Sequence, residues 1–237
     1  MSDLKSDMRA PASIRSRLLF VDDHPIVLDG YQTMLKSQPD LELCGLATNA
    51  AEALQMFQDQ RPNLMVMDLS LPGRGGLDLL KDILALDASA RVLVCSMHDE
   101  MLYAERALRA GAKGYVMKDC SATLLLSAIQ RVLAGGIHVS ERLAVQVLET
   151  FAGTRPRGSH SPLEKLSDRE FEVFVLFGEG RTAKEIGAKL NLSPKTVSVH
   201  RDHIKEKMEF STSAEMIRQA VRWVESQSVK GSPGSPR

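Results

Sequence analysis

The chain has 237 residues, of which 43% are hydrophobic, and its 30 basic and 30 acidic residues give a formal net charge of zero. This length exceeds the roughly 100–150 residues of one ordinary domain and supplies enough apolar material for two cores. No apolar run approaches the roughly 20 residues of a membrane helix, which excludes a membrane-spanning class, and an evenly spread charge of zero would argue against a nucleic-acid partner.

The first segment, residues 1–17, is polar and carries scattered arginine and lysine residues. It lacks the apolar stretch of a signal peptide. We therefore expect a loose tail at this end and a cytoplasmic protein.

Four short apolar runs follow, at residues 18–21, 64–67, 92–95 and 115–117. Such unbroken runs are typical of strands in a parallel sheet that is covered on both faces. Reactive groups in open parallel sheets collect past the carboxyl ends of the strands. The polar residues that follow the runs are Asp22, Asp23, Asp68, Ser96 and Lys118. We expect these side chains to converge in one acidic pocket with one lysine and one hydroxyl.

Three carboxylates in one small pocket repel one another and need a counter-ion, and oxygen ligands with room for water suit Mg²⁺ or Mn²⁺. Asp68 is then a candidate nucleophile, because a carboxylate that attacks phosphorus forms an aspartyl phosphate. The metal and the Lys118 ammonium would neutralise the phosphoryl group, while the Ser96 hydroxyl donates to one of its oxygens. A single strand-end aspartate often only starts a loop or caps a helix, so the prediction depends on the whole set.

Longer motifs surround these residues: Val21-Asp22-Asp23-His24-Pro25, Met67-Asp68-Leu69-Ser70-Leu71-Pro72-Gly73, Ser96, and Gly114-Tyr115-Val116-Met117-Lys118. Together they resemble the receiver domain of two-component response regulators. The resemblance implies a doubly wound, flavodoxin-like α/β fold with five parallel strands. It also implies that a partner histidine kinase phosphorylates Asp68, and that the metal is held by Asp22, Asp23, Asp68 and the Ser70 carbonyl.

The same resemblance implies that Ser96 and Tyr115 form a switch pair, in which the hydroxyl moves to the phosphoryl group and the ring turns inward. One departure is Asp119, which follows the lysine where many receivers have proline. A cis peptide before a residue other than proline costs about 2.5–4 kcal/mol, so the usual cis bond is in doubt here.

The three cysteines, Cys44, Cys95 and Cys120, have neither paired nor metal-type spacing. Reduced thiols within the core are therefore expected. Charge, by contrast, is unevenly spread along the chain. Residues 18–137 contain fifteen acidic and ten basic residues, whereas residues 181–207 contain seven basic and three acidic ones. A local basic patch of this kind is what phosphate binding needs.

Residues that break secondary structure separate the two parts. Gly135-Gly136 ends a helix predicted from Ser121, residues 141–151 can form another helix, and residues 153–159 read as a flexible linker. We divide the chain into a tail (1–17), a receiver domain (18–135), a linker with a helix (136–162), a second domain (163–227) and a disordered tail (228–237).

Four helix starts follow the linker. Ser167 with Glu170, Thr182 with Glu185, and Thr212 with Glu215 have the spacing of capping boxes, and Ser193-Pro194 places proline at the first helical position. Short turns at residues 178–180 and 191–192 separate the first three helices. This all-α pattern predicts a helix-turn-helix with a supporting helix before it.

The third of these helices has two distinct faces at about 100° per residue. Val197, Ile204 and Met208 share one face, with His200 and Arg201 at its edges, and the opposite face carries Lys195, Ser198, Val199, Asp202 and Glu206. If the helix enters the major groove by its N-terminal end, Ser198, Val199 and Asp202 can reach base edges. Lys184, Lys195, Thr196 and Lys205 are placed for phosphates. An isolated basic helix, however, is more often only a solvated charged face.

The segments Leu166-Ser167-Asp168-Arg169-Glu170, Lys184-Glu185-Ile186 and Leu192-Ser193-Pro194-Lys195-Thr196-Val197, with His200, Ile204 and Lys207-Met208, resemble the LuxR-type helix-turn-helix over residues 163–225. With the receiver, they identify the chain as a member of the NarL/FixJ-type response regulators. The resemblance implies that phosphorylation of Asp68 controls sequence-specific DNA binding and transcription. It also implies that the protein is not an enzyme. The implied partners are double-stranded DNA, a sensor histidine kinase, RNA polymerase, and a second copy that pairs on DNA through the helix at residues 213–225.

Two departures from this family pattern are Ala183, where asparagine is common, and Ser213, where a basic residue is common. Asp202 and Glu206 should also repel the DNA backbone, so we expect a monomer to bind weakly. His200 is expected to be an inward, structural histidine.

Two rival functions stay open. One is a DNA-binding regulator that does not depend on phosphorylation and uses the receiver as a dimerisation module. The other is an aspartate-nucleophile phosphohydrolase, although such enzymes usually place the nucleophile first in a DxD sequence that Asp22-Asp23 does not form. Trp223, the only tryptophan, lies in the second domain and is expected to report poorly on metal binding in the first.

Overall fold

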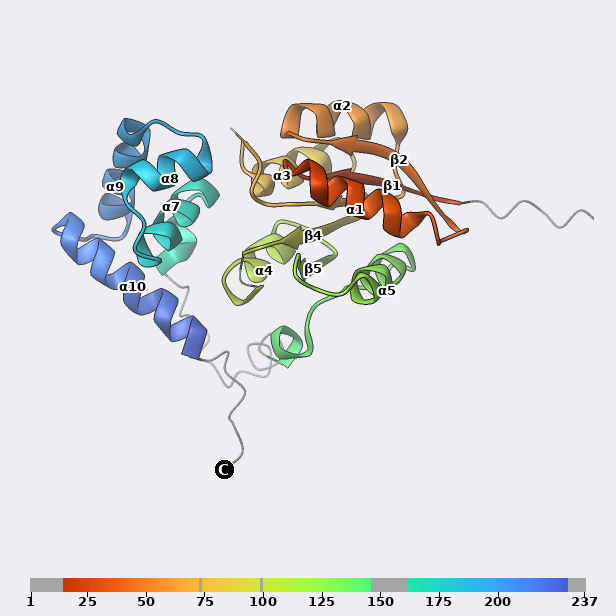
Figure 1. Cartoon of the computed structure of the whole chain (residues 1–237). Coiled ribbons are helices and arrows are strands. Elements are labelled where there is room, and N and C mark those ends of the chain that lie inside the picture. Colours follow the sequence, from red (N-terminus) through yellow and green to blue (C-terminus); the bar gives the residue numbers. More distant parts are fainter. Residues whose placement is uncertain (1–14, 73, 99, 146–161, 230–237) are drawn as a thin grey trace, which may run out of the picture.

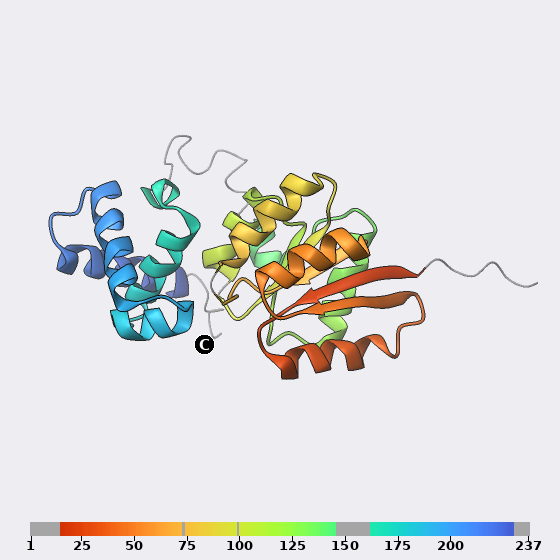
Figure 2. The same ribbon diagram turned by 90° about the horizontal axis from the view of Figure 1, so that it is seen from above.

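The computed structural model describes residues 15–72, 74–98, 100–145 and 162–229. Within these ranges a five-stranded α/β unit is followed by an all-helical unit, so the predicted fold class is confirmed. Figures 1 and 2 show the two units side by side. No helix of the described ranges has the length and apolar character needed to cross a membrane.

The first unit is built on one parallel sheet with the strand order β2-β1-β3-β4-β5. Its strands are β1 (Ser16–Val21), β2 (Leu41–Ala47), β3 (Leu64–Met67), β4 (Val92–Ser96) and β5 (Gly114–Met117). All four predicted runs lie in strands. The edge strand β2 is not among those runs because exposed Glu42 interrupts its apolar pattern.

Five helices cover the two faces of the sheet: α1 (Pro25–Leu35), α2 (Ala50–Gln60), α3 (Gly76–Leu86), α4 (Glu100–Arg109) and α5 (Ala122–Leu133). Successive residues of a strand point to opposite faces. In β1, Leu19 and Val21 accordingly pack in one core with α2, α3 and α4, while Leu18 and Phe20 pack in the other with α1 and α5. All of β3 is buried between the two layers, as the unbroken apolar run predicts.

The register of the sheet brings the reactive strand ends to one level. Val21, the last residue of β1, pairs with Met67, the last residue of β3. Asp22 and Asp68 therefore leave the sheet side by side, where the strand order changes direction between β1 and β3. The amide of Lys118, just past β5, donates to the carbonyl of Ser96, the last residue of β4, at 2.9 Å.

The helical unit consists of a 3₁₀ turn, η1 (Pro162–Lys165), and the helices α7 (Asp168–Gly178), α8 (Ala183–Leu190), α9 (Pro194–Lys207) and α10 (Ser213–Val229). The predicted capping boxes at Ser167 and Thr182 form with both reciprocal hydrogen bonds, and the Ser193 hydroxyl caps α9. The third box differs from the prediction, because the Glu215 carboxylate accepts from the amide of Ser211 and not from that of Thr212.

Glycine is required at one point of the helix-turn-helix. A Cβ at Gly187 would lie 2.6 Å from the Leu192 carbonyl oxygen, so α8 and the turn before α9 pack backbone to backbone. Asn191 ends α8 with a left-handed φ of 53°, a conformation that asparagine tolerates better than most residues.

The domain boundaries stay predictions where they fall outside the described ranges. Residues 141–145 are helical, as predicted, whereas the remainder of the 141–151 helix, the linker at 153–159, and most of both predicted tails lie outside the described residues. β1 begins at Ser16 and α10 reaches Val229, two residues beyond the predicted domain limits at each point. The described residues contain no cis peptide bond, and this includes the bond between Lys118 and Asp119.

Candidate functional site

The predicted acidic pocket forms at the carboxyl ends of the strands. Asp22 and Asp68 are buried, with 1% and 2% of their surface exposed, while Asp23 is partly exposed. The Lys118 ammonium lies 2.7 Å from Asp22 Oδ2 and 2.8 Å from Asp68 Oδ2. One lysine therefore bridges the two buried carboxylates.

Two opposing effects act on Lys118. Burial alone would lower its pKa, but the Asp68 and Asp22 carboxylates outweigh burial and raise the pKa above its ordinary value. The side chain is consequently a permanent cation at neutral pH. It is suited to stabilise negative charge that develops on a group bound to Asp68.

The second oxygen of Asp68 is available for chemistry. Asp68 Oδ1 is buried and accepts no hydrogen bond within the described part of the chain. A buried carboxylate oxygen without a partner is costly, so a ligand that satisfies it is favoured. Lys118 joins Asp68 to Asp22, and Asp22 lies in one group with Asp23. The carboxylate oxygens of these residues fit Mg²⁺ or Mn²⁺, which prefer oxygen ligands.

His24 was not among the predicted site residues, although it closes one side of the pocket. Its Nδ1 lies 2.8 Å from Asp23 Oδ1 and 3.2 Å from Asp22 Oδ1, and one ligand atom from each of the three residues lies within 4.8 Å of the others. Its position directly after the two aspartates was the signal available in the sequence.

The proposed switch residues are both buried behind the pocket. Ser96 is fully buried, and its Oγ accepts a hydrogen bond from the His98 amide at 3.3 Å. Tyr115 is also buried, and its hydroxyl donates to the His98 carbonyl oxygen at 2.8 Å. The Tyr115 ring is therefore buried in this structure, and its movement on phosphorylation stays a prediction.

His98 is a second residue that the sequence analysis missed. Its Nε2 lies 2.8 Å from Ser70 Oγ, and Ser70 belongs to the loop whose carbonyl was predicted to hold the metal. Burial, with only 7% of the residue exposed, lowers the pKa of His98 to about 4. The ring is therefore neutral at physiological pH, so one of its nitrogens carries a proton and the other does not.

The predicted recognition helix, α9, has the two faces expected. Val197 and Ile204 are buried against α7 and α8, and Met208 is partly buried at the end of the helix. Lys195, Val199, Asp202 and Glu206 are exposed, and Ser198 is partly exposed.

Several candidate DNA contacts have partners in their own helix. The Ser198 hydroxyl donates to the Pro194 carbonyl oxygen at 3.1 Å, and Thr196 Oγ1 lies 2.8 Å from Ser193 Oγ. Lys205 lies 3.6 Å from Asp202 Oδ1, so the repulsion expected between Asp202 and a DNA backbone is partly balanced. Lys184, on α8, is exposed to solvent, as a residue that contacts a phosphate must be.

His200 is partly buried at the edge of α9, which is consistent with an inward position. Burial, followed by the nearby Arg169, lowers its pKa. Its Nδ1 is buried and has no hydrogen-bond partner among the described residues. The predicted structural role of His200 therefore depends on packing and not on a hydrogen bond from this atom.

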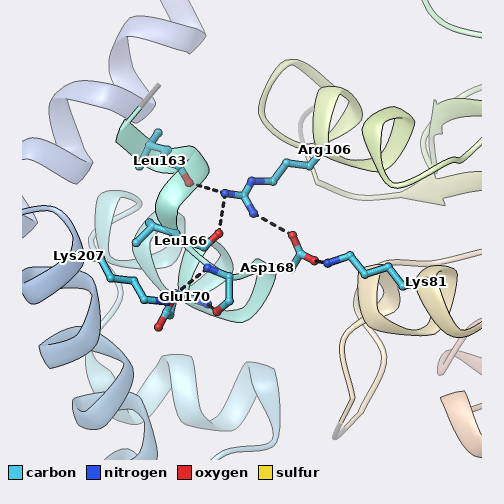
Figure 3. Close-up of polar contacts among 8 residues, drawn as sticks. Lys81, Arg106, Leu163, Leu166, Asp168, Glu170 and Lys207 are labelled. Carbon is cyan, nitrogen blue, oxygen red and sulfur yellow. Dashed lines mark hydrogen bonds and ion pairs between the residues drawn. The ribbon is translucent and has the colours of Figure 1, made fainter. Parts of the chain in front are cut away.

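The receiver and the helical unit are joined by a group of polar contacts that the sequence did not predict (Figure 3). Arg106 of α4 donates to Asp168 Oδ1 at 2.8 Å, to the Leu163 carbonyl at 2.5 Å and to the Leu166 carbonyl at 3.1 Å. Lys81 of α3 contacts the other oxygen of Asp168 at 2.5 Å. We call this group the Arg106 clamp, defined by Lys81, Arg106, Leu163, Leu166 and Asp168.

The same turn of α7 also contacts the recognition helix. Lys207, the last residue of α9, contacts Glu170 Oε2 at 2.6 Å, while Glu170 also closes its own capping box (Figure 3). Burial would raise the pKa of Glu170, but Lys207 and the bonds from Ser167 lower it below its ordinary value. One turn of helix therefore contacts the receiver through Asp168 and the recognition helix through Glu170.

Comparison with known proteins gives a consistent result for both units. The family model described as "Response regulator receiver domain" matches residues 18–130, and the model "Bacterial regulatory proteins, luxR family" matches residues 164–220. The chain is 31% identical over 210 residues to "Oxygen regulatory protein NreC" of Staphylococcus carnosus, an alignment that covers 87% of this chain and 97% of the relative.

Solved structures show the same likeness. A LuxR-family two-component response regulator from Aurantimonas sp. is 36% identical, with a TM-score of 0.54, and covers 58% of this chain and 99% of its own. RcsB from Salmonella enterica serovar Typhimurium, solved on the promoter rprA with the phosphomimetic BeF3⁻, is 25% identical with a TM-score of 0.58. That alignment covers 87% of this chain and 98% of RcsB.

Proposed function

The chain belongs to the LuxR-type two-component response regulators, and from this premise we propose that a phosphoryl group on Asp68 controls its binding to double-stranded DNA. The observation that carries the proposal is the state of Asp68, which is buried and joined to Asp22 by Lys118, while its Oδ1 accepts no hydrogen bond from the described residues. That oxygen is the nucleophile.

The phosphoryl donor is a phosphohistidine of a sensor kinase. Asp68 Oδ1 forms a bond to phosphorus while the phosphorus–nitrogen bond of the donor breaks, and the leaving imidazole takes a proton from solvent. Lys118 holds the negative charge of the transferring group, and Ser96 donates to one of its oxygens. A Mg²⁺ or Mn²⁺ ion held by Asp22, Asp23, Asp68 and the Ser70 carbonyl would supply further charge neutralisation.

Phosphorylation changes the electrostatics of the pocket. The phosphoryl group adds about −1.5 to −2 charges at neutral pH. Lys118, now shared between Asp22 and Asp68, and the Ser96 hydroxyl are drawn to the new oxygens. The change loosens the contact between the receiver and the helical unit, or pairs two receivers, and brings two recognition helices to adjacent half-sites on DNA.

On DNA, α9 enters the major groove by its N-terminal end. Ser198, Val199 and Asp202 face base edges, and Lys184, Lys195, Thr196 and Lys205 contact phosphates. RcsB, the similar protein, has been solved in complex with DNA, which supports the same partner here. A homodimer that pairs through α10, contact with RNA polymerase, and a cytoplasmic location complete the proposal.

The test measures phosphorylation and DNA binding in one preparation. Wild type and Asp68→Asn are treated with acetyl phosphate and Mg²⁺, the phosphoryl content is read by intact mass, and affinity is measured on promoter fragments chosen from a genome-wide binding map. We expect wild type alone to gain a phosphoryl group and to bind DNA more tightly. Equal DNA affinity before and after phosphorylation would support the rival in which the receiver only dimerises, and turnover of small phosphate esters would support a phosphohydrolase.

A further inference from the structure

His98 contacts three residues close to the Asp68 pocket and one residue of α4. Its amide donates to Ser96 Oγ, its carbonyl accepts from the Tyr115 hydroxyl, and its Nε2 is within hydrogen-bond distance of Ser70 Oγ. Its ring stacks on Tyr103 of α4, with the ring centroids 4.3 Å apart and the planes inclined by 28°. A single buried residue thus contacts both switch residues, the metal-binding loop and α4.

From Tyr103 the ring contacts continue into the helical unit. The Tyr103 ring meets Phe171 of α7 edge to face, with centroids 5.3 Å apart. Phe171 in turn meets Trp223 of α10 edge to face at 5.6 Å, a usual geometry for aromatic pairs. We call the series His98, Tyr103, Phe171 and Trp223 the ring series. It runs without a gap from the β4–α4 loop to the last helix.

The rings of the series are packed closely enough that movement of one ring should displace the next. His98, Tyr103 and Phe171 are all buried, and protein interiors have little free volume in which a ring can shift alone. The Tyr103 hydroxyl has no hydrogen-bond partner in the described ranges, so ring contacts rather than a polar bond hold this side chain in place.

We propose that His98 is a positioning residue that transmits the state of the Asp68 pocket to α10 through the ring series. This inference rests on the proposed function, because it requires a phosphoryl group at Asp68. When Ser96 Oγ turns to that group, the His98 amide loses its acceptor and the loop that carries the ring moves. The His98 ring withdraws from Tyr103, and the Tyr103–Phe171 contact between the two units weakens.

The alternative route is the Arg106 clamp alone. The clamp contacts the same α7, and the Arg106 guanidinium carbon lies 4.2 Å from the centroid of the Phe171 ring. The polar contacts of Lys81 and Arg106 described above lead to the helical unit. The hydrogen bonds of His98 lead to Ser96, Tyr115 and Ser70. The clamp holds the units together, whereas the ring series links that contact to the pocket.

Trp223 makes the inference testable, because the only tryptophan of the chain ends the ring series. Full-length protein is titrated with BeF3⁻ and Mg²⁺, a phosphoryl mimic. Binding is followed by ¹⁹F NMR and the surroundings of Trp223 by its emission and acrylamide quenching. In wild type we expect the Trp223 signal to change as BeF3⁻ binds. In His98→Leu we expect BeF3⁻ to bind while the Trp223 response is lost.

Two further variants keep the test decisive. Tyr103→Leu interrupts the ring series outside the pocket, so it should lose the response even if His98→Leu fails to fold. His98→Phe keeps the backbone amide that bonds Ser96 and a ring on Tyr103, so it should respond like wild type. Met97→Leu is the matched control, because Met97 is the neighbouring residue and is 67% exposed, so it should respond like wild type.

The outcomes separate the two proposals. If BeF3⁻ does not bind the wild-type pocket, the proposed function fails. If BeF3⁻ binds but Trp223 does not respond in wild type, if His98→Leu and Tyr103→Leu respond as fully as wild type, or if His98→Phe loses the response, the role of His98 is overturned and the proposed function stands.

Discussion

The Asp68 pocket and the outward face of α9 differ in how far their side chains are buried. Asp22, Asp68 and Ser96 are almost completely buried, and each is held at the end of a strand whose neighbours fix its backbone. On α9, Lys195, Val199 and Asp202 project from an exposed helix face into solvent. Changes to the buried pocket residues should therefore abolish phosphorylation, whereas changes on α9 should lower DNA affinity by graded amounts.

The largest effect is expected at the nucleophile. Asp68→Asn keeps the shape of the side chain but removes the attacking carboxylate, so phosphoryl incorporation from acetyl phosphate with Mg²⁺ should vanish. Intact-mass spectrometry measures the incorporation. Asp82→Asn is the matched control, since Asp82 lies on α3 and pairs with Arg74 outside the pocket. Labelling of Asp68→Asn at the wild-type level would refute the assignment.

A smaller but still large effect is expected at Asp23, which is only partly exposed and lies next to His24. Asp23→Ala should lower Mg²⁺ affinity by about tenfold or more, because even residues that only orient metal ligands cost about 10–100-fold. Phosphorylation should slow in parallel. A direct Mg²⁺ titration by NMR that gives the wild-type affinity would remove Asp23 from the metal site.

The contact between the two units should give an intermediate effect. Arg106→Ala should favour separation of the units by about 1.5–3 kcal/mol, since it leaves the Leu163 and Leu166 carbonyls without this charged donor and Asp168 with Lys81 alone. Lys81→Ala is the internal control, because Lys81 has the same acceptor but is 55% exposed, and exposed ion pairs contribute about 0–1 kcal/mol. Small-angle X-ray scattering and the rate of proteolysis between the units measure separation. Equal effects of the two variants would show that burial does not determine the strength of the clamp.

The smallest and most selective effects are expected on α9. Lys195→Ala should weaken binding to all DNA sequences alike and reduce the slope of the salt dependence by about one, because a phosphate contact releases a counter-ion and carries no base information. Val199→Ala and Ser198→Ala should instead cost about 1–3 kcal/mol at one base position and little elsewhere. Binding isotherms on single-base variants at several salt concentrations distinguish these patterns. If the patterns are exchanged, the placement of α9 in the groove is wrong.

The sequence predicted elements correctly where burial produces an apolar run or where the interacting residues are close together in the chain. The four apolar runs are strands because both faces of the sheet are covered, and the capping boxes at Ser167 and Thr182 involve residues only three apart. The edge strand β2 lacked the signal because solvent reaches one of its residues. The pocket was predictable because parallel strands necessarily bring their carboxyl ends together.

Contacts between the two units left no such pattern. Arg106 and Asp168 are 62 residues apart, and neither is unusual for its own helix. We expected the Trp223 signal to report poorly on metal binding in the receiver only because Trp223 lies in the other domain. Its place at the end of the ring series depends on how the units pack, which no local spacing records.

The first turn of α7 has a consequence for building hybrid regulators. Asp168 faces the receiver and Glu170 faces the recognition helix, two residues further along the same turn. A foreign receiver joined to this DNA-binding unit within residues 146–161 would bring neither the arginine that Asp168 accepts from nor the tyrosine that meets Phe171. We expect such a hybrid to bind DNA without responding to phosphorylation of the foreign receiver. The response should return when the foreign receiver also carries residues equivalent to Lys81 on α3 and to Tyr103 and Arg106 on α4.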